Sequence, residues 1–148
     1  MNEEKLQRLL KDKQIIKKSP DIERAKSLIK SAENTAETQL QNILMEKSAT
    51  SIFREIYEAM RQLGDALWWI QGYEAQTHDA SIDIIKTADF LNAGQKVKAL
   101  SLDRLKTIRY DANYRGFQIS ISQAQEIIEA WNIIGKAICS HLKKKLSL

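Results

Sequence analysis

The chain has 148 residues, of which 43% are hydrophobic and 28% are charged, and its formal net charge is +4. This balance excludes an intrinsically disordered chain and is typical of a single domain with one hydrophobic core. Only one proline and five glycines occur, which argues against a sheet-rich fold with many tight turns and favours long helices.

The first predicted element is an amphipathic helical arm over residues 1–18, which precedes the main domain over residues 19–148. Its apolar positions recur on one side of a helix, at Leu6, Leu9, Leu10 and Ile16. The other positions are polar, so we expect the arm to be docked loosely. The pattern does not indicate whether it docks on its own chain or on another.

A long helix is predicted to begin at Ser19-Pro20-Asp21. Ser19 is a suitable N-cap, and Pro20 fits the first helical position. Apolar residues then recur at spacings of three and four from residue 22 to residue 44, which indicates one buried face. The same periodicity from residue 51 to residue 70 predicts a second long helix.

This second long helix is expected to end at Gly72, because glycine is the preferred residue just after a helix. Near its end stand Trp68 and Trp69, which point in different directions because they are adjacent on a helix. At least one of the two indole rings is therefore expected to lie off the core face, at an interface.

Two further helices are predicted in the middle of the chain. The first covers residues 79–90 and is expected to break at Asn92-Ala93-Gly94. The second covers residues 97–112, and Gly116 marks the turn that follows it.

The last predicted helix begins at a capping box formed by Ser120 and Gln123. Its apolar face runs as far as Leu142, and three lysines, Lys143–Lys145, follow. Long amphipathic helices joined by short loops predict an all-α fold, an up-and-down helical bundle.

Several kinds of site are excluded. The single cysteine, Cys139, lies in an apolar helical stretch, which indicates a buried reduced thiol. The sequence has no Cys and His cluster with zinc spacing, no glycine-rich phosphate loop and no nucleophile elbow, so we expect no metal and no cofactor.

The N-terminus is charged and no run approaches about 18 apolar residues, so we expect a cytoplasmic protein without a membrane segment.

One polar cluster, at the end of the helix predicted over residues 97–112, has the residue types for binding chemistry. Its candidate residues are Arg109, Tyr110, Asp111, Asn113, Tyr114 and Arg115. Guanidinium groups suit phosphates and phenol rings suit unpaired bases, and the basic net charge permits a nucleic-acid partner. The alternative is structural: Arg109 pairs with Asp103 or Asp111, and Tyr114 plugs an end of the bundle. Residue types alone favour this alternative.

The order of these features resembles the HEPN domains, a family of small helical-bundle proteins. Three segments carry the resemblance: the alanines Ala25, Ala32 and Ala36; residues 66–78, with a Gly-Tyr turn and a Thr-His pair; and residues 109–114, followed by Ile119-Ser120. It implies a four-helix bundle with an additional short helix. It also implies a homodimer in which the blocks over residues 109–114 of two chains face each other.

The resemblance also implies a chemistry. Active HEPN proteins are metal-independent ribonucleases, often toxins paired with a nucleotidyltransferase-type antitoxin, and their signature is an arginine, four to six residues and a histidine. Arg109 matches the arginine, but Tyr114 stands where the histidine is expected. A tyrosine has a pKa of about 10 and is almost fully protonated at pH 7, whereas a histidine holds both forms. This departure predicts weak or absent catalysis.

Three functions therefore remain open. The one that we favour is an RNA- or nucleotide-binding homodimer with a composite cleft around Arg109 and Tyr114. The second is a metal-independent endoribonuclease toxin that uses the same cleft, and the third is a non-catalytic dimeric scaffold or nucleotidyltransferase partner. His78 is a further binding candidate if it faces this cleft; the alternative is a histidine packed at the start of a helix.

Overall fold

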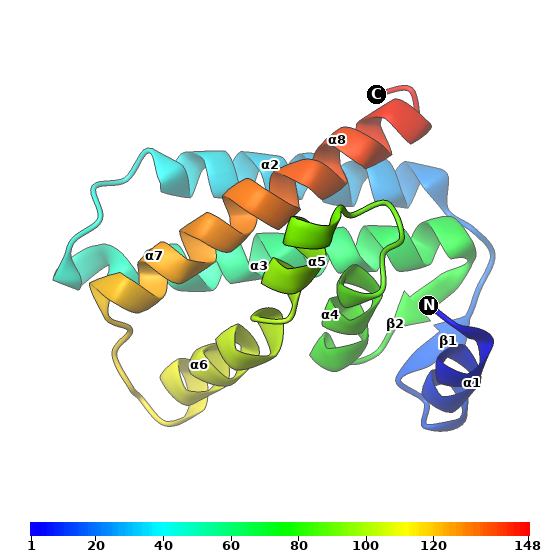
Figure 1. The fold of residues 1–148 in the computed structure, drawn as a ribbon, viewed down its shortest axis with the longest axis horizontal. Helices are drawn as coiled ribbons and strands as arrows, with labels where there is room; N and C mark the ends of the chain where they lie inside the picture. Colours follow the sequence, from blue (N-terminus) through cyan, green and yellow to red (C-terminus); the bar gives the residue numbers. More distant parts are fainter.

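The computed structural model describes residues 1–148, and nearly all of its regular structure is helical (Figure 1). The helices are α1 (Glu3–Lys11), α2 (Ile22–Leu40), α3 (Glu46–Gln71), α4 (His78–Lys86), α5 (Ala93–Ala99), α6 (Leu102–Tyr114), α7 (Ile121–Ala130) and α8 (Lys136–Lys145). A π-helical segment, Trp131–Gly135, joins α7 to α8 in one rod, and β1 (Ile15–Lys17) pairs antiparallel with β2 (Tyr73–Ala75). The predicted all-α helical bundle is confirmed.

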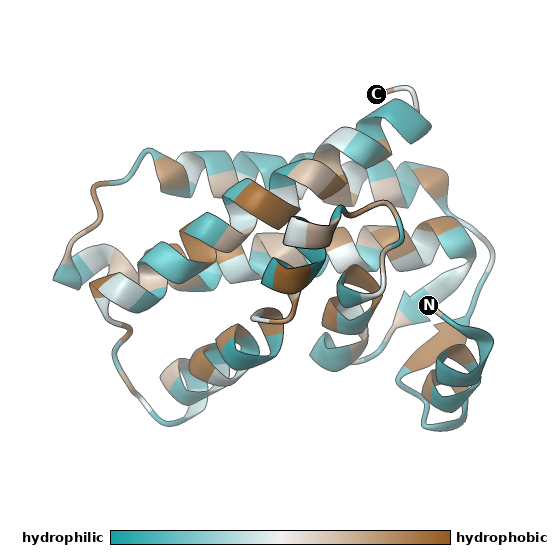
Figure 2. Ribbon diagram, in the orientation of Figure 1, coloured by the Kyte–Doolittle hydropathy of each residue, from teal (hydrophilic) through white to brown (hydrophobic).

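The 26-residue helix α3 forms the centre of the bundle. It contacts α2, α4, α6 and α7, and Figure 1 shows α2 lying antiparallel beside it while the α7–α8 rod runs across them. Figure 2 shows apolar and hydrophilic residues alternating along the long helices, as expected of helices that each bury one face. Because α4 and α6 both pack on α3, residues far apart in the sequence meet beside it.

The end of α3 confirms one prediction and corrects another. Gly72 ends the helix in a left-handed conformation, with φ 84°. Both indole rings before it are buried, so the prediction that one lies off the core is wrong. Trp68 donates from Nε1 to the Ala80 carbonyl of α4 at 2.9 Å, and Trp69 lies 4.4 Å below the Arg24 guanidinium of α2. Helices α2 and α4 thus cover different sides of α3.

The N-terminal arm is not a single helix to residue 18. After α1 the chain turns at Lys13, with φ 56°, and then forms β1. Ile15 pairs with Ala75 of β2 and is 1% exposed, and Leu9 of α1 is buried as well. The expectation of a loosely docked arm is wrong, because two β-branched residues find a strand partner on the same chain.

We expect Ile15→Ala to lower the free energy of unfolding by about 2–4 kcal/mol, because it removes a buried side chain that holds the arm to the body. Urea denaturation followed by circular dichroism measures this loss. Ile43→Ala is the matched control, since Ile43 is 75% exposed and should change stability by less than about 0.5 kcal/mol. Equal, small effects of both changes would mean that the arm is not docked.

Helix boundaries differ from the prediction where side-chain caps decide them. Helix α2 begins after Asp21, whose carboxylate accepts a backbone N–H of the first turn, rather than at Ser19-Pro20. Asn92 starts a helix instead of breaking one, because it forms a capping box with Gln95. The helix predicted over residues 97–112 is therefore two helices, α5 and α6.

The last helix begins as predicted. Ser120 and Gln123 form both hydrogen bonds of the capping box, and the apolar face is buried as far as Leu142. Cys139 is buried, in agreement with the prediction. None of the helices combines the length and the apolar composition that a membrane span requires.

Candidate nucleic-acid interface

A cleft of about 460 Å³ lies between the start of α4 and one face of α6. Its lining residues are Thr77, His78, Asp79, Lys106, Thr107, Arg109, Tyr110 and Tyr114. The cleft thus brings together four of the predicted binding residues, three from one helix and one from another. Figure 1 shows α4 and α6 side by side below α3.

The α4 wall of the cleft is fixed to α3. Gly64 of α3 allows this close approach, because a Cβ atom there would overlap the backbone carbonyl of Ser81. The Ser81 hydroxyl donates to Asp65, which also pairs with Arg61 at 2.6 Å. The Thr77 side chain accepts the Ala80 N–H and caps α4. Together these contacts position the first residues of α4.

Arg109 has no carboxylate partner. Asp103 pairs instead with Lys86 at 2.7 Å, and Asp111 pairs with Arg115 at 3.8 Å. The structural alternative, in which Arg109 pairs with one of these two acids, is therefore wrong. Its half-buried guanidinium lines the cleft and leaves a positive charge available to an anion.

A buried tyrosine connects the two walls. The Arg109 guanidinium lies 5.5 Å from the centre of the Tyr57 ring, and the His78 ring lies 6.4 Å from the same ring at an angle of 25°. Burial raises the pKa of Tyr57 to about 12. Burial, together with the charges of Arg109 and Arg61, lowers the pKa of His78. The imidazole is therefore neutral at pH 7, and its Nδ1 is buried without a hydrogen-bond partner.

Two exposed phenol rings flank the arginine. Tyr110 is 55% exposed and Tyr114 is 69% exposed, and their ring centres are 4.9 Å apart with planes tilted by 43°. The exposed position of Tyr114 contradicts the alternative that it plugs an end of the bundle. Adjacent exposed rings offer a surface on which unpaired bases stack.

Three of the predicted residues do not line the cleft. Asp111 and Arg115 pair with each other on another side of α6, and Asn113 is exposed outside the cleft. Lys106, which was not among the residues predicted from the sequence, lines the cleft and pairs with Asp79 across it. Its spacing of four from Tyr110 places it on the same helix face, and this signal could have found it.

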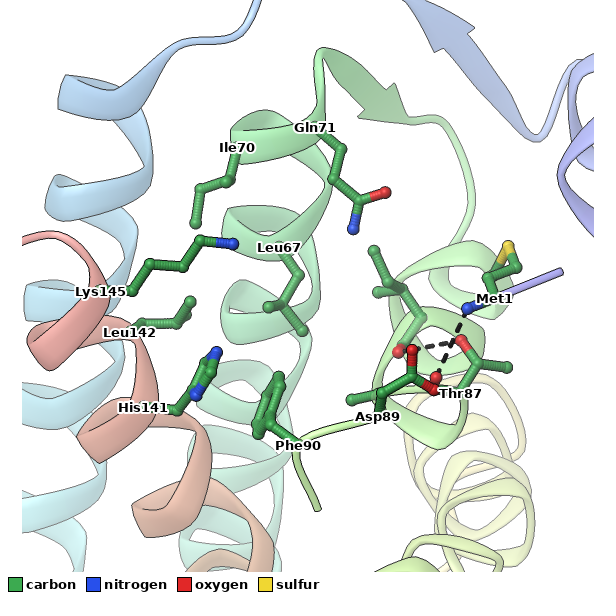
Figure 3. A pocket seen from close by; sticks show the side chains of 12 residues that line it. Met1, Leu67, Ile70, Gln71, Thr87, Asp89, Phe90, His141, Leu142 and Lys145 are labelled. Carbon is green, nitrogen blue, oxygen red and sulfur yellow. Dashed lines mark hydrogen bonds between the residues drawn. The ribbon is translucent and has the colours of Figure 1, made fainter. Parts of the chain in front are cut away.

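A separate cavity of about 230 Å³ lies where the ends of α3, α4 and α8 meet (Figure 3). Leu67, Phe90 and Leu142 supply apolar surface, and the Phe90 ring stacks on His141 with ring centres 3.8 Å apart. Burial and two neighbouring lysines lower the pKa of His141. The polar rim of this cavity mixes Asp89 with the basic groups of His141 and Lys145, and it carries no exposed pair of aromatic rings like that of the cleft.

No protein-family model matches the chain, and no curated protein or solved structure matches it either. Membership of the HEPN family therefore stays a prediction.

Proposed function

We propose that the cleft binds a nucleotide unit of single-stranded RNA, or a free nucleotide of the same chemistry. The observation that carries the proposal is an arginine without a carboxylate partner beside two exposed phenol rings. A guanidinium forks onto phosphate oxygens, and aromatic rings stack on bases that are not paired. A duplex hides its bases, so the cleft favours single strands.

The charges of the cleft support a phosphate beside Arg109. Lys106 pairs with Asp79, the one carboxylate among the lining residues, so this acid is neutralised and the charge of Arg109 remains. Helix α4 begins at the edge of the cleft, and the N-terminus of a helix favours anions. The cleft therefore combines a phosphate site with a stacking surface.

We also propose that the protein acts as a homodimer in which a second copy completes the cleft. The exposed rings of Tyr110 and Tyr114 lie at the end of α6, where a second wall would shield them from water. Light scattering at micromolar concentration measures the molar mass. A monomer would leave the binding proposal standing and remove the composite cleft.

We expect Tyr114→Ala to weaken the binding of single-stranded RNA by about tenfold, because it removes a stacking ring worth about 1–3 kcal/mol per base. Tyr114→Phe keeps the ring and should bind like the wild type. Fluorescence anisotropy with a labelled oligonucleotide measures both, and Val97→Ala serves as a control for an exposed apolar side chain outside the cleft. Equal affinity for a duplex of the same sequence would contradict recognition of unpaired bases.

A second function, metal-independent RNA cleavage, is favoured by one observation: His78 shares the cleft with Arg109. Nε2 of the neutral imidazole would take the proton of a ribose 2′-hydroxyl, whose oxygen then attacks the adjacent phosphorus. The 5′-oxygen leaves with a proton from water, which gives a 2′,3′-cyclic phosphate and a 5′-hydroxyl end. Arg109 would stabilise the charge on the phosphorane.

If this second function holds, cleavage in EDTA should be lost in His78→Gln and retained in His141→Gln, the matched histidine outside the cleft. The rate should rise with pH and reach its plateau at a lower pH than a free histidine would give, because the base must be neutral and the pKa of His78 is lowered. Gel analysis of a mixed single-stranded pool measures both effects. A wild-type protein that binds the pool without cutting it would limit the function to binding.

A further inference from the structure

A second groove, of about 570 Å³, lies on the other side of the end of α6. It runs between the first turns of α3 and the loop from α6 to α7. The loop turns at Gly116, with φ 70°, and is fixed to α3 because the Ile119 N–H donates to the Thr50 hydroxyl at 3.0 Å. This hydrogen bond joins the two walls of the groove.

The groove carries cations that lack acidic partners. Lys47 and Arg54 are exposed and form no ion pair, and Arg54 uses one nitrogen to donate to the Ala112 carbonyl at 3.1 Å. The remaining donors of that guanidinium are free to bind an anion. Glu46 is the one carboxylate among the lining residues, so the groove has a net positive charge.

An exposed aromatic ring lies in the same groove. Phe117 is 53% exposed, and the Arg115 guanidinium lies 5.0 Å from its ring centre. An apolar ring exposed in a basic groove matches the alternation of stacking rings and cations that single-stranded nucleic acids bind. The net positive charge of the groove is complementary to the phosphates of a nucleic acid.

The groove adjoins the cleft. Tyr114 is the last residue of the chain that lines the cleft and Gly116 is the first of its loop that lines the groove, so only Arg115 separates them in sequence. We propose that single-stranded RNA continues from the cleft around the end of α6 into this groove. There Phe117 stacks on a further base, and Lys47 and Arg54 bind a further phosphate. This inference rests on the proposed function and extends it from one nucleotide unit to a strand.

The test compares the affinities of a labelled dinucleotide and a labelled octanucleotide of the same composition. Phe117→Ala should weaken octanucleotide binding by about tenfold and leave the dinucleotide unchanged. Lys47→Ala should lower the slope of log K against log salt by about 0.7 for the octanucleotide, which is the loss of one phosphate contact. Lys11→Ala is the matched control, since Lys11 is an exposed lysine without an ion pair on α1.

The outcomes separate this inference from the function on which it rests. If Arg109→Ala weakens binding of both oligonucleotides by more than tenfold while Phe117→Ala changes neither, the groove is not used and the cleft still is. If the wild type binds neither oligonucleotide, both proposals fail. If Phe117→Ala lowers the molar mass without changing RNA affinity, the groove is a contact between copies, and the inference is overturned.

Discussion

Arg109→Ala should weaken the binding of single-stranded RNA by more than tenfold and leave the fold intact. The side chain supplies the charge in the cleft that no carboxylate neutralises, and a lost hydrogen bond to a charged group costs about 1.5–3 kcal/mol, or more than tenfold in affinity. The guanidinium rests on the Tyr57 ring and is half-buried, so its loss removes little of the core. Fluorescence anisotropy measures the affinity, and circular dichroism checks the helical content.

Arg104→Ala is the matched control for this experiment. It removes the same charge from the same helix, but Arg104 pairs with Glu126 at 2.7 Å and does not line the cleft. Arg109→Lys should bind with intermediate affinity, because an ammonium keeps the charge and loses the forked geometry. Unchanged affinity in Arg109→Ala, with a loss in Arg104→Ala, would place the RNA elsewhere on the molecule.

The largest loss of stability is expected from Gly64→Ala. A Cβ at this position would overlap the carbonyl of Ser81, and both atoms belong to the backbones of packed helices, so α4 must move away from α3. We expect the free energy of unfolding to fall by about 3 kcal/mol or more, at the upper end of overpacking effects. RNA affinity should fall too, because α4 carries Thr77 and His78 into the cleft.

Gly94→Ala is the control for Gly64→Ala. Gly94 lies inside α5, and an added Cβ would meet only the Asn92 side chain at 3.6 Å. Alanine has the higher helix propensity, so this variant should be more stable by up to about 1 kcal/mol. Urea denaturation measures the free energy of unfolding of both variants. Equal stability of the two would mean that α3 and α4 are not packed as closely as the structure has them.

The parts of the fold that could be predicted from the sequence are those that depend on local pattern. The apolar spacing predicted the long helices, and Gly72 and the Ser120–Gln123 capping box predicted two of their ends. The arm was predicted as a helix because Ile16 continues the spacing of Leu6 and Leu9. Strand β1 of the arm depends on pairing with β2, which lies beyond α3 in the chain. The local sequence of the arm does not predict this pairing.

Some residues of the candidate site could be predicted from the sequence, and others could not. Arg109, Tyr110 and Tyr114 stand close together in the sequence, so their residue types alone predicted a binding site. Tyr57 and Gly64 contribute through the approach of α4 to α3, and in the sequence they are ordinary members of an apolar helix. The role of such residues depends on how two helices pack, so the sequence of one helix alone does not reveal it.

The pairing of β1 with β2 also limits the order in which the chain acquires its structure during synthesis. The N-terminal residues emerge from the ribosome first, but β1 has no partner until α3 and β2 have followed. Neighbouring helices α2 and α3 close a short loop and associate early, whereas the contact of Ile15 with Ala75 must wait. Strand β2 leads directly into Thr77, so the His78 wall of the cleft settles only after about half of the 148 residues have been translated.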